Sequence, residues 1–180
     1  MRELWDTHCH LQDPRLAAPE VLIRAREAGV GRVVACGTCE ADWPRVLELA
    51  AQEPCVVPAI GLHPWFIPEA SPGWEDRLEQ QLRAHAAAVG ECGLDFALPE
   101  ADHERQVAAL LPQWRLAVAL DRPLTLHCRK AFDVLADVAR TEGLPRPGAV
   151  VHAWSGSPEQ LRTLQDLGFH MGFGCSLAHP

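Results

Sequence analysis

The chain has 180 residues, 48% of them hydrophobic, and a formal net charge of −8 at neutral pH. This length and composition favour one globular domain over residues 1–180. The sequence has no run of eighteen apolar residues and no basic segment leading into an apolar one at its start. A transmembrane helix is therefore excluded, and we expect no export signal and a cytoplasmic protein. The acidic balance argues against a broad basic surface for duplex nucleic acid.

Short apolar segments alternate with helical segments along the chain. The first half is predicted to contain strand Leu4–Asp6, helix Pro19–Ala28, strand Val30–Cys36, a helix after Asp42, strand Val56–Leu62 and helix Trp74–Ala88. The second half is predicted to contain a short segment Ala88–Gly90 that leads into Glu91–Asp95, a helix over 102–120 bent or restarted near Pro112, strand Leu124–Leu126, helix Ala131–Thr141, strand Ala149–Val151, a helix begun by a capping box of Ser157 and Gln160, and strand Phe169–Leu177. This alternation predicts parallel βαβ units whose sheet is buried on both faces.

Metal-compatible side chains recur where the predicted strands end. Asp6, His8 and His10 share one face, because side chains alternate along a strand. The residues of this kind at later strand ends are His63, Glu91, His127 and His152. A doubly wound nucleotide-binding fold would need a glycine-rich turn after the first strand, and the sequence has none. Active groups at the carboxyl ends of many strands instead favour a TIM-type (β/α) barrel, with about seven of its eight strands in this chain.

Imidazole and carboxylate ligands suit Zn, Mn or Mg ions used for hydrolysis. Four imidazoles and one carboxylate exceed the needs of one tetrahedral ion, which favours two divalent ions bridged by Glu91. Such a pair activates water and binds both oxygens of a phosphoryl displacement. The seven cysteines are not arranged as two CxxC pairs with the spacing of a zinc finger, and those beside ligands face the opposite side of the sheet. We predict that all seven are reduced, buried thiols.

Several neighbouring residues have predicted roles around these ligands. Arg129 follows His127 by two residues, so its side chain should point to the same end of the barrel as His127. A guanidinium there can bind a phosphate through two hydrogen bonds. His63, which precedes Pro64, could be a metal ligand, a hydrogen-bond donor to the substrate phosphate, or a histidine of the loop. The contact with the substrate is favoured. Asp6 lies deeper in its strand and is predicted to orient a ligand.

Aspartate and tryptophan residues near these motifs have structural predictions. Asp95 is predicted to hold the following turn through backbone hydrogen bonds. Trp65, Trp74 and Trp154 are predicted to pack rather than to stack on bases.

Five motifs together resemble those of the TatD family of metal-dependent deoxyribonucleases, a branch of the amidohydrolase-like barrels. They are DTHCH at 6–10, GLHP at 61–64, GECGLD at 90–95, LHCR at 126–129 and VHAWSGS at 151–157. The resemblance implies that His8 and His10 bind one ion, that Glu91 bridges, and that His127 and His152 bind the second. It also implies that His63 and Arg129 lie near the scissile phosphate of DNA. A water molecule activated by the ions would attack this phosphate.

Two features depart from the family pattern. Lys130 stands where family members commonly carry an acidic residue after the arginine, and the chain ends at Pro180, after the seventh predicted strand. The family's eighth strand and its aspartate ligand are therefore expected to be missing, and the open edges should favour self-association. The alternatives are a shortened non-catalytic barrel that acts through association, and a related hydrolase of a small-molecule or aminoacyl-tRNA ester or amide.

Overall fold

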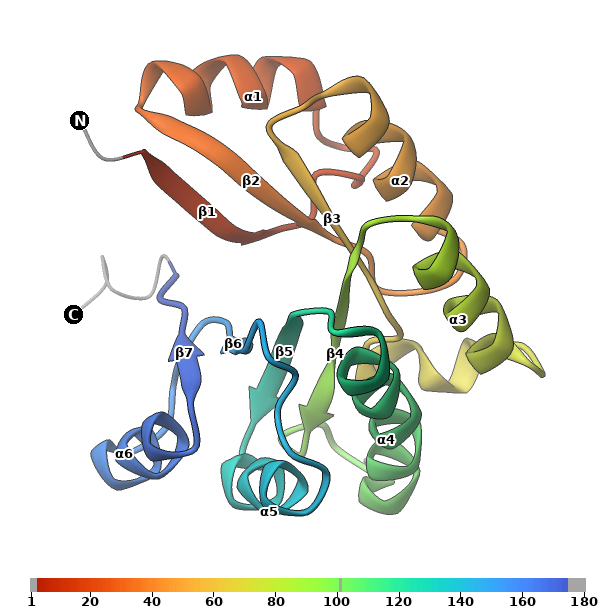
Figure 1. Ribbon diagram of the computed structural model, residues 1–180, viewed down its shortest axis with the longest axis vertical. Helices are drawn as coiled ribbons and strands as arrows, with labels where there is room; N and C mark the ends of the chain where they lie inside the picture. Colours follow the sequence, from red (N-terminus) through yellow and green to blue (C-terminus); the bar gives the residue numbers. More distant parts are fainter. Residues whose placement is uncertain (1–2, 101, 175–180) are drawn as a thin grey trace.

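A computed structural model describes residues 3–100 and 102–174. Seven parallel strands form one sheet in the order β1-β2-β3-β4-β5-β6-β7, which curls into an open half-barrel (Figure 1). The strands are β1 (Leu4–Cys9), β2 (Val30–Cys36), β3 (Val56–Ile60), β4 (Ala88–Asp95), β5 (Leu124–Arg129), β6 (Ala149–Val151) and β7 (Phe169–Met171). The predicted α/β class and barrel-like curvature are confirmed.

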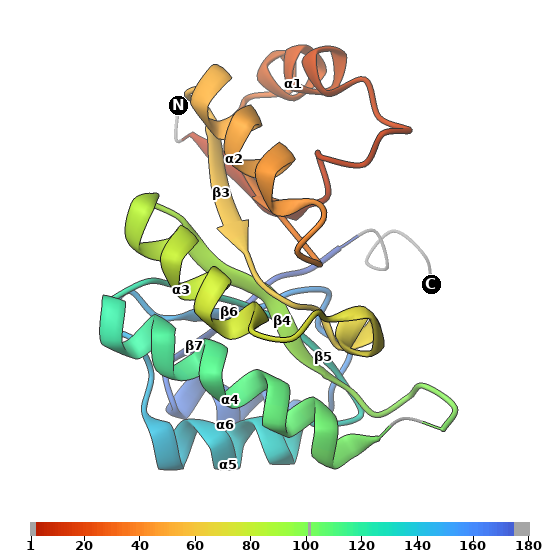
Figure 2. The same ribbon diagram turned by 90° about the vertical axis from the view of Figure 1, so that its right-hand side faces the viewer.

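Helices cover the outer face of this curved sheet, as Figures 1 and 2 show from two directions. They are α1 (Ala18–Glu27), α2 (Trp43–Gln52), α3 (Trp74–Ala84), α4 (His103–Leu120), α5 (Phe132–Glu142) and α6 (Pro158–Asp166), with the 3₁₀ helix η1 (Pro64–Glu69) after β3. The predicted capping box of α6 is present, with Ser157 and Gln160 bonding each other's backbone. No helix in the described part of the chain is long and apolar enough to cross a membrane.

Most element boundaries differ from prediction by a few residues. The predicted bounds of β2 and β6 match those observed. Helix α3 ends at Ala84 rather than Ala88, because Ala88 begins the buried strand β4. Strand β5 continues to Arg129, beyond the predicted Leu126. The last strand is observed over Phe169–Met171, and the predicted remainder at 175–177 lies outside the described residues.

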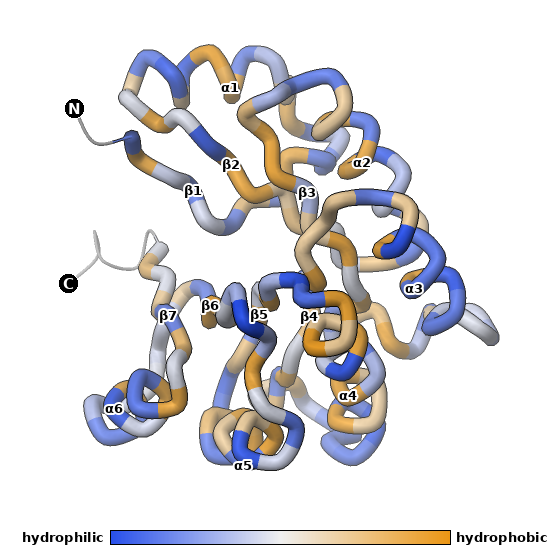
Figure 3. Tube along the Cα trace, in the orientation of Figure 1, coloured by the Kyte–Doolittle hydropathy of each residue, from blue (hydrophilic) through white to orange (hydrophobic). Residues whose placement is uncertain are grey.

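The hydrophobic core lies between the sheet and its helices. Apolar residues run along the strands and recur along each helix in Figure 3. Leu78 and Leu82 of α3 are fully buried, as their spacing predicts. Trp114 of α4 is also fully buried, and its indole N–H donates to the carbonyl of Gly143 at 2.6 Å. This packing fixes α4 against the sheet.

Two buried glutamines of α4 hold the ends of β3 and β4. The side chain of Gln113 accepts from Leu62 N at 2.7 Å and donates to Leu62 O at 3.1 Å. Gln106 makes the same pair of bonds to Asp95, accepting from its N–H at 2.7 Å and donating to its carbonyl at 3.0 Å. Helix α4 therefore positions the strand ends where polar residues gather.

The two edges of the sheet remain open. Within residues 3–100 and 102–174, β1 pairs with β2 alone and β7 pairs with β6 alone. These edges lie on the same side of the molecule in Figure 1. Leu4 and Trp5 on β1 are 57% and 54% exposed, and Phe173 after β7 is 57% exposed.

Candidate metal centre

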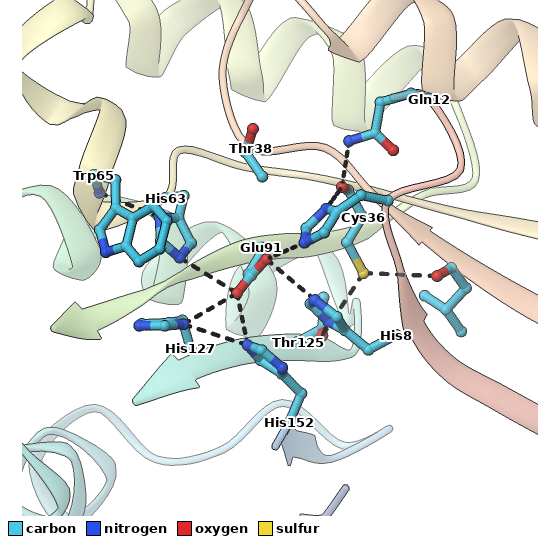
Figure 4. Close-up of polar contacts among 12 residues, drawn as sticks. His8, Gln12, Cys36, Thr38, His63, Trp65, Glu91, Thr125, His127 and His152 are labelled. Carbon is cyan, nitrogen blue, oxygen red and sulfur yellow. Dashed lines mark hydrogen bonds and ion pairs between the residues drawn. The ribbon is translucent and has the colours of Figure 1, made fainter. Parts of the chain in front are cut away.

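The carboxylate of Glu91 lies at the centre of five histidine rings (Figure 4). Strand β4 is buried along its whole length, and Glu91 itself is 2% exposed. Its Oε1 lies 2.7 Å from His152 Nε2, 3.3 Å from His127 Nδ1 and 3.4 Å from His63 Nε2. Its Oε2 lies 3.2 Å from His8 Nε2 and 3.3 Å from His10 Nε2. The structure thus brings together every histidine predicted from the strand-end pattern.

Close packing of β4 against β5 makes this arrangement possible. Gly93 pairs with His127 and has a φ of +142°, a region that side chains disfavour. A Cβ atom on Gly93 would lie 2.0 Å from the carbonyl oxygen of His127. Glycine is therefore required here for β5 to carry His127 alongside Glu91.

The charges of the site favour a bound cation. Burial opposes ionisation of Glu91, but hydrogen bonds from His127 and His152 outweigh it and hold the carboxyl pKa well below its usual range. Burial lowers the pKa of both His8 and His63, which keeps these rings neutral at neutral pH. Burial opposes protonation of His127, but hydrogen bonds to Glu91 and Asp95 outweigh it and raise the pKa of this ring. An ionised carboxylate beside the neutral ring of His8 supplies lone pairs for a metal ion.

The hydrogen bonds of three rings leave a nitrogen free for a metal. His10 Nδ1 donates to the carbonyl of Cys36 at 2.9 Å, which leaves Nε2 with its lone pair toward Glu91. His127 Nε2 donates to Asp95 Oδ2 at 2.9 Å, which leaves Nδ1 on the Glu91 side. The buried Nε2 of His8 has no hydrogen-bond partner among residues 3–100 and 102–174. These donors fit divalent metal ions, whose histidine ligands commonly bond a second group through the other ring nitrogen.

His63 has a different bonding pattern. Its Nδ1 accepts from the backbone N–H of Trp65 at 3.2 Å, so the neutral ring carries its hydrogen on Nε2. His63, Glu91 and His127 do lie close enough to hold an ion together, as do His8, His10 and Glu91. In this tautomer Nε2 carries a hydrogen and lies 3.4 Å from Glu91 Oε1, so His63 is a donor there, and its substrate-side role stays a prediction.

Two other predicted residues lie farther out. Asp6 is exposed, and its Oδ1 accepts from the backbone N–H of His8 at 3.1 Å rather than from an imidazole. Arg129 does not contact Glu91 directly. It lies to one side of the carboxylate, and its Nη1 is 3.5 Å from Asp95 Oδ2. With Lys130 it lines a neighbouring cavity of about 440 Å³ instead of the cavity that contains Glu91.

Asp95 has a role beyond the one predicted. Its Oδ1 accepts from Ala97 N at 3.1 Å, which holds the following turn as expected. Its Oδ2 also accepts from His127 Nε2 and from the indole N–H of Trp65, both at 2.9 Å. Asp95 lies four residues after Glu91 in β4, so the alternation of strand side chains could have placed it on the same face.

The cavity above Glu91 is open to solvent and has a volume of about 630 Å³. Its walls include Gln12 and Arg15 after β1, Thr38 after β2, and Trp65 and Phe66 of η1. Trp74 is buried and Trp154 packs against the core, as predicted, whereas Trp65 is 51% exposed at this cavity. The prediction that Trp65 packs is therefore wrong.

Residues 5–179 match a protein-family model described as TatD related DNase. The chain is 38% identical to the uncharacterized metal-dependent hydrolase YjjV of Escherichia coli K12, covering 97% of this chain and 69% of the relative. It is 36% identical to the 3′-5′ ssDNA/RNA exonuclease TatD of Edwardsiella piscicida, covering 86% of this chain and 60% of the relative. The chain thus spans 60% to 69% of the length of these relatives.

Solved structures show the same architecture. The crystal structure of the E. coli YjjV protein, a TatD homologue, superposes with a TM-score of 0.92 at 37% identity, covering 98% of this chain and 70% of that one. A TatD family hydrolase from Entamoeba histolytica superposes with a TM-score of 0.81 at 22% identity, covering 96% of this chain and 65% of that one. The second likeness concerns the fold alone.

Proposed function

The chain belongs to the TatD related DNase family, and we propose that it is a metal-dependent hydrolase that cleaves phosphodiester bonds in single-stranded DNA or RNA. The observation that carries this proposal is Glu91, buried and ionised within reach of five imidazoles. The relative from E. piscicida is named a 3′-5′ ssDNA/RNA exonuclease, which supports a nucleic-acid substrate. The open cavity above Glu91 supports access for a flexible single strand.

We propose that the centre holds two divalent ions that share Glu91. His8 and His10 would complete one ligand set, because they approach Oε2. His127 and His152 would complete the other, because they approach Oε1. Bound there, divalent ions would lower the pKa of water and offset the charge of a phosphate.

The remaining polar residues would handle the phosphate and its protons. His63 presents an N–H at Nε2, so it can donate to a phosphate oxygen or to the departing oxygen. Asp95 holds His127 in the tautomer whose Nδ1 is free. Arg129, at the side of the centre, would bind a phosphate as it enters.

Metal content and digestion of single-stranded DNA test this proposal directly. Wild-type protein loaded with Mn²⁺ or Mg²⁺ should degrade the DNA, and Glu91→Ala and His127→Ala should lower the rate by roughly a hundredfold or more, since even outer partners of metal ligands cost about 10–100-fold. The control is His170→Ala, which changes an exposed histidine on β7. Equal activity in wild type and both variants, with no bound ion, would sink the proposal. Hydrolysis of a chromogenic carboxylic ester but not of DNA would support the related hydrolase instead.

We also propose that the open sheet edges let the chain associate with itself. Leu4, Trp5 and Phe173 expose large apolar side chains beside the edges of β1 and β7, which have no second strand partner among the described residues. Such edges offer unpaired backbone groups to another chain. Sedimentation velocity should show a dimer or larger species, and Trp5→Glu should shift it toward monomer. A wild-type monomer at about 100 μM, where edge-exposed proteins associate, would exclude this proposal.

A further inference from the structure

Trp65 is half-exposed and yet firmly fixed. It lies in η1, and 51% of its surface is accessible. Its indole N–H donates to Oδ2 of the fully buried Asp95 at 2.9 Å, and its backbone N–H donates to His63 Nδ1 at 3.2 Å. Trp residues are usually largely buried, so a ring held by a hydrogen bond from its indole N–H but left open on one side needs an explanation.

The ring lies at the border between the metal centre and a second hollow. Figure 4 shows Trp65 beside His63, and their ring centroids are 5.1 Å apart, with His127 at 6.1 Å. On its other side Trp65 lines a hollow of about 300 Å³, together with Pro64, Pro68, Leu98 and Pro99. This volume reaches the lower end of the range for small-ligand sites. Six of the ten lining residues are apolar, and the others are Glu100, Asp102, Arg105 and Gln106.

We infer that Trp65 is the surface on which one base of the single-stranded substrate stacks, next to the phosphate that reacts at Glu91. This inference rests on the proposed nuclease function and adds the means by which the strand is held. Aromatic side chains bind single strands by stacking, which tolerates any base because every base presents a π-face. The ring needs little ordering on binding, because its indole N–H is already bonded to Asp95 and the backbone of Trp65 is bonded to His63.

The charge of the molecule makes such a contact more important. The net charge of −8 and the single lysine leave little general attraction for a polyanion. Stacking is less affected by this charge than phosphate binding is. A strand held at Trp65 would have one base in this second hollow and its neighbouring phosphate at the cavity of Glu91.

An abasic substrate separates stacking from every other contribution. Two labelled 12-nucleotide single strands would be compared, one normal and one with its three 3′-terminal bases removed. The wild type should bind the normal strand roughly five- to a hundredfold more tightly by fluorescence anisotropy in EDTA, and kcat/KM with Mn²⁺ should show a similar ratio, in the range that stacking of one base supplies. Trp65→Leu should bind both strands equally.

Trp65→Phe distinguishes stacking from the hydrogen bond to Asp95. Phenylalanine keeps an aromatic face but loses the indole N–H, so this variant should retain most of the preference for the normal strand. If Trp65 served only to orient Asp95 and His127, both variants would lower cleavage of the normal and abasic strands by the same factor. Ile23→Ala is the control, since Ile23 is similarly exposed, at 52%, but lies on α1 away from the site and from the sheet edges.

Each outcome of this experiment is decisive. Equal binding of the two strands by wild type, or an unchanged preference in Trp65→Leu, would overturn the stacking role. Normal stacking preference in anisotropy without cleavage under any metal would instead support the role of Trp65 and contradict the nuclease proposal. The binding measurement needs no metal, so the two proposals fail separately.

Discussion

Asp95 connects three side chains through a single carboxylate oxygen. Its Oδ2 accepts from His127 and Trp65 and lies 3.5 Å from Arg129. Although burial opposes ionisation, hydrogen bonds from Trp65 and His127 lower the pKa of this carboxyl, so it stays charged at neutral pH. The state of one residue therefore sets the orientation of His127, Trp65 and Arg129.

Asp95→Asn should weaken metal binding without removing a ligand. The amide can offer a hydrogen where His127 needs an acceptor, so the ring loses its enforced tautomer. We expect metal affinity to fall by about 10–100-fold, the usual effect of losing such a partner. Competition with a chromogenic chelator measures it, with Asp137→Asn on the exposed side of α5 as control. Unchanged affinity in Asp95→Asn would show that His127 is not held in this way.

Cys36, Cys92 and Cys128 are buried, whereas Cys9, Cys39 and Cys55 are half-buried, so the prediction that all seven cysteines are buried is wrong; Cys175 lies outside the described residues. The cysteines with a raised thiol pKa should resist alkylation. Burial raises the pKa of Cys9 and of Cys128 to about 12, and it raises those of Cys36 and Cys92 as well. At pH 8 these thiols stay protonated and are poor nucleophiles. Peptide mapping after brief iodoacetamide treatment should find the half-buried Cys39 and Cys55 modified first. Rapid labelling of Cys92 in folded protein would contradict the described packing.

Helix α4 determines where β3 and β4 end. Gln113 and Gln106 lie two helical turns apart on one face, and each bonds both backbone groups of a strand-end residue. The residue after Leu62 is His63, and Asp95 holds His127. This helix therefore fixes the site without contributing a ligand to it.

Gln113→Leu should destabilise the fold. The substitution leaves the N–H and carbonyl of Leu62 buried without their partner, and each such group costs about 1–3 kcal/mol. We expect the free energy of unfolding to fall by about 2–4 kcal/mol in urea titrations. Gln80→Leu, on the exposed side of α3, should change it by less than about 0.5 kcal/mol. A similar loss in both variants would point to helix propensity rather than to the hydrogen bonds between Gln113 and Leu62.

The elements that follow local rules were predictable from sequence. The spacing of Leu78 and Leu82 and the capping box at Ser157 depend only on near neighbours, and both are observed. The gathering of histidines around Glu91 was also predictable, since parallel strands bring their carboxyl ends to one edge. The hydrogen bonds of Gln106 and Gln113 to the strand ends and the bond between Trp65 and Asp95 could not be predicted. Each joins residues that are distant in sequence and whose polar side chains would ordinarily face solvent.

At the scale of the whole molecule, the proposed metal centre joins both halves of the open sheet. His8 and His10 come from β1 and the turn after it, Glu91 from β4, and His127 from β5. The rings of His8 and His152 stack 3.7 Å apart, which brings the ends of β1 and β6 together although the strands are not neighbours in the sheet. Ions bound here would act as cross-links between these strands.

Removing metal should therefore lower thermal stability. A ligand that binds only the folded state stabilises it by about 2.7 kcal/mol at a hundredfold excess over its Kd, so Mn²⁺ or Zn²⁺ should raise Tm by several degrees over protein in EDTA. Mg²⁺ should raise it less, because imidazole ligands suit transition metals better. Differential scanning calorimetry measures both, and Glu91→Ala should abolish the increment. An equal rise in Glu91→Ala would place the stabilising ion elsewhere.

The contact between His8 and Thr125 has a consequence for the time course of folding. These residues are 117 positions apart, and Thr125 Oγ1 lies 3.4 Å from Nδ1 of His8. Contacts between such distant positions form slowly, because a long loop must close before they contribute. His8 at the end of the first strand can approach Glu91, His127 and His152 only after β4, β5 and β6 have assembled into the sheet. In a refolding experiment, uptake of ions should therefore lag behind the formation of helices, and it would report the moment when the ends of the sheet meet.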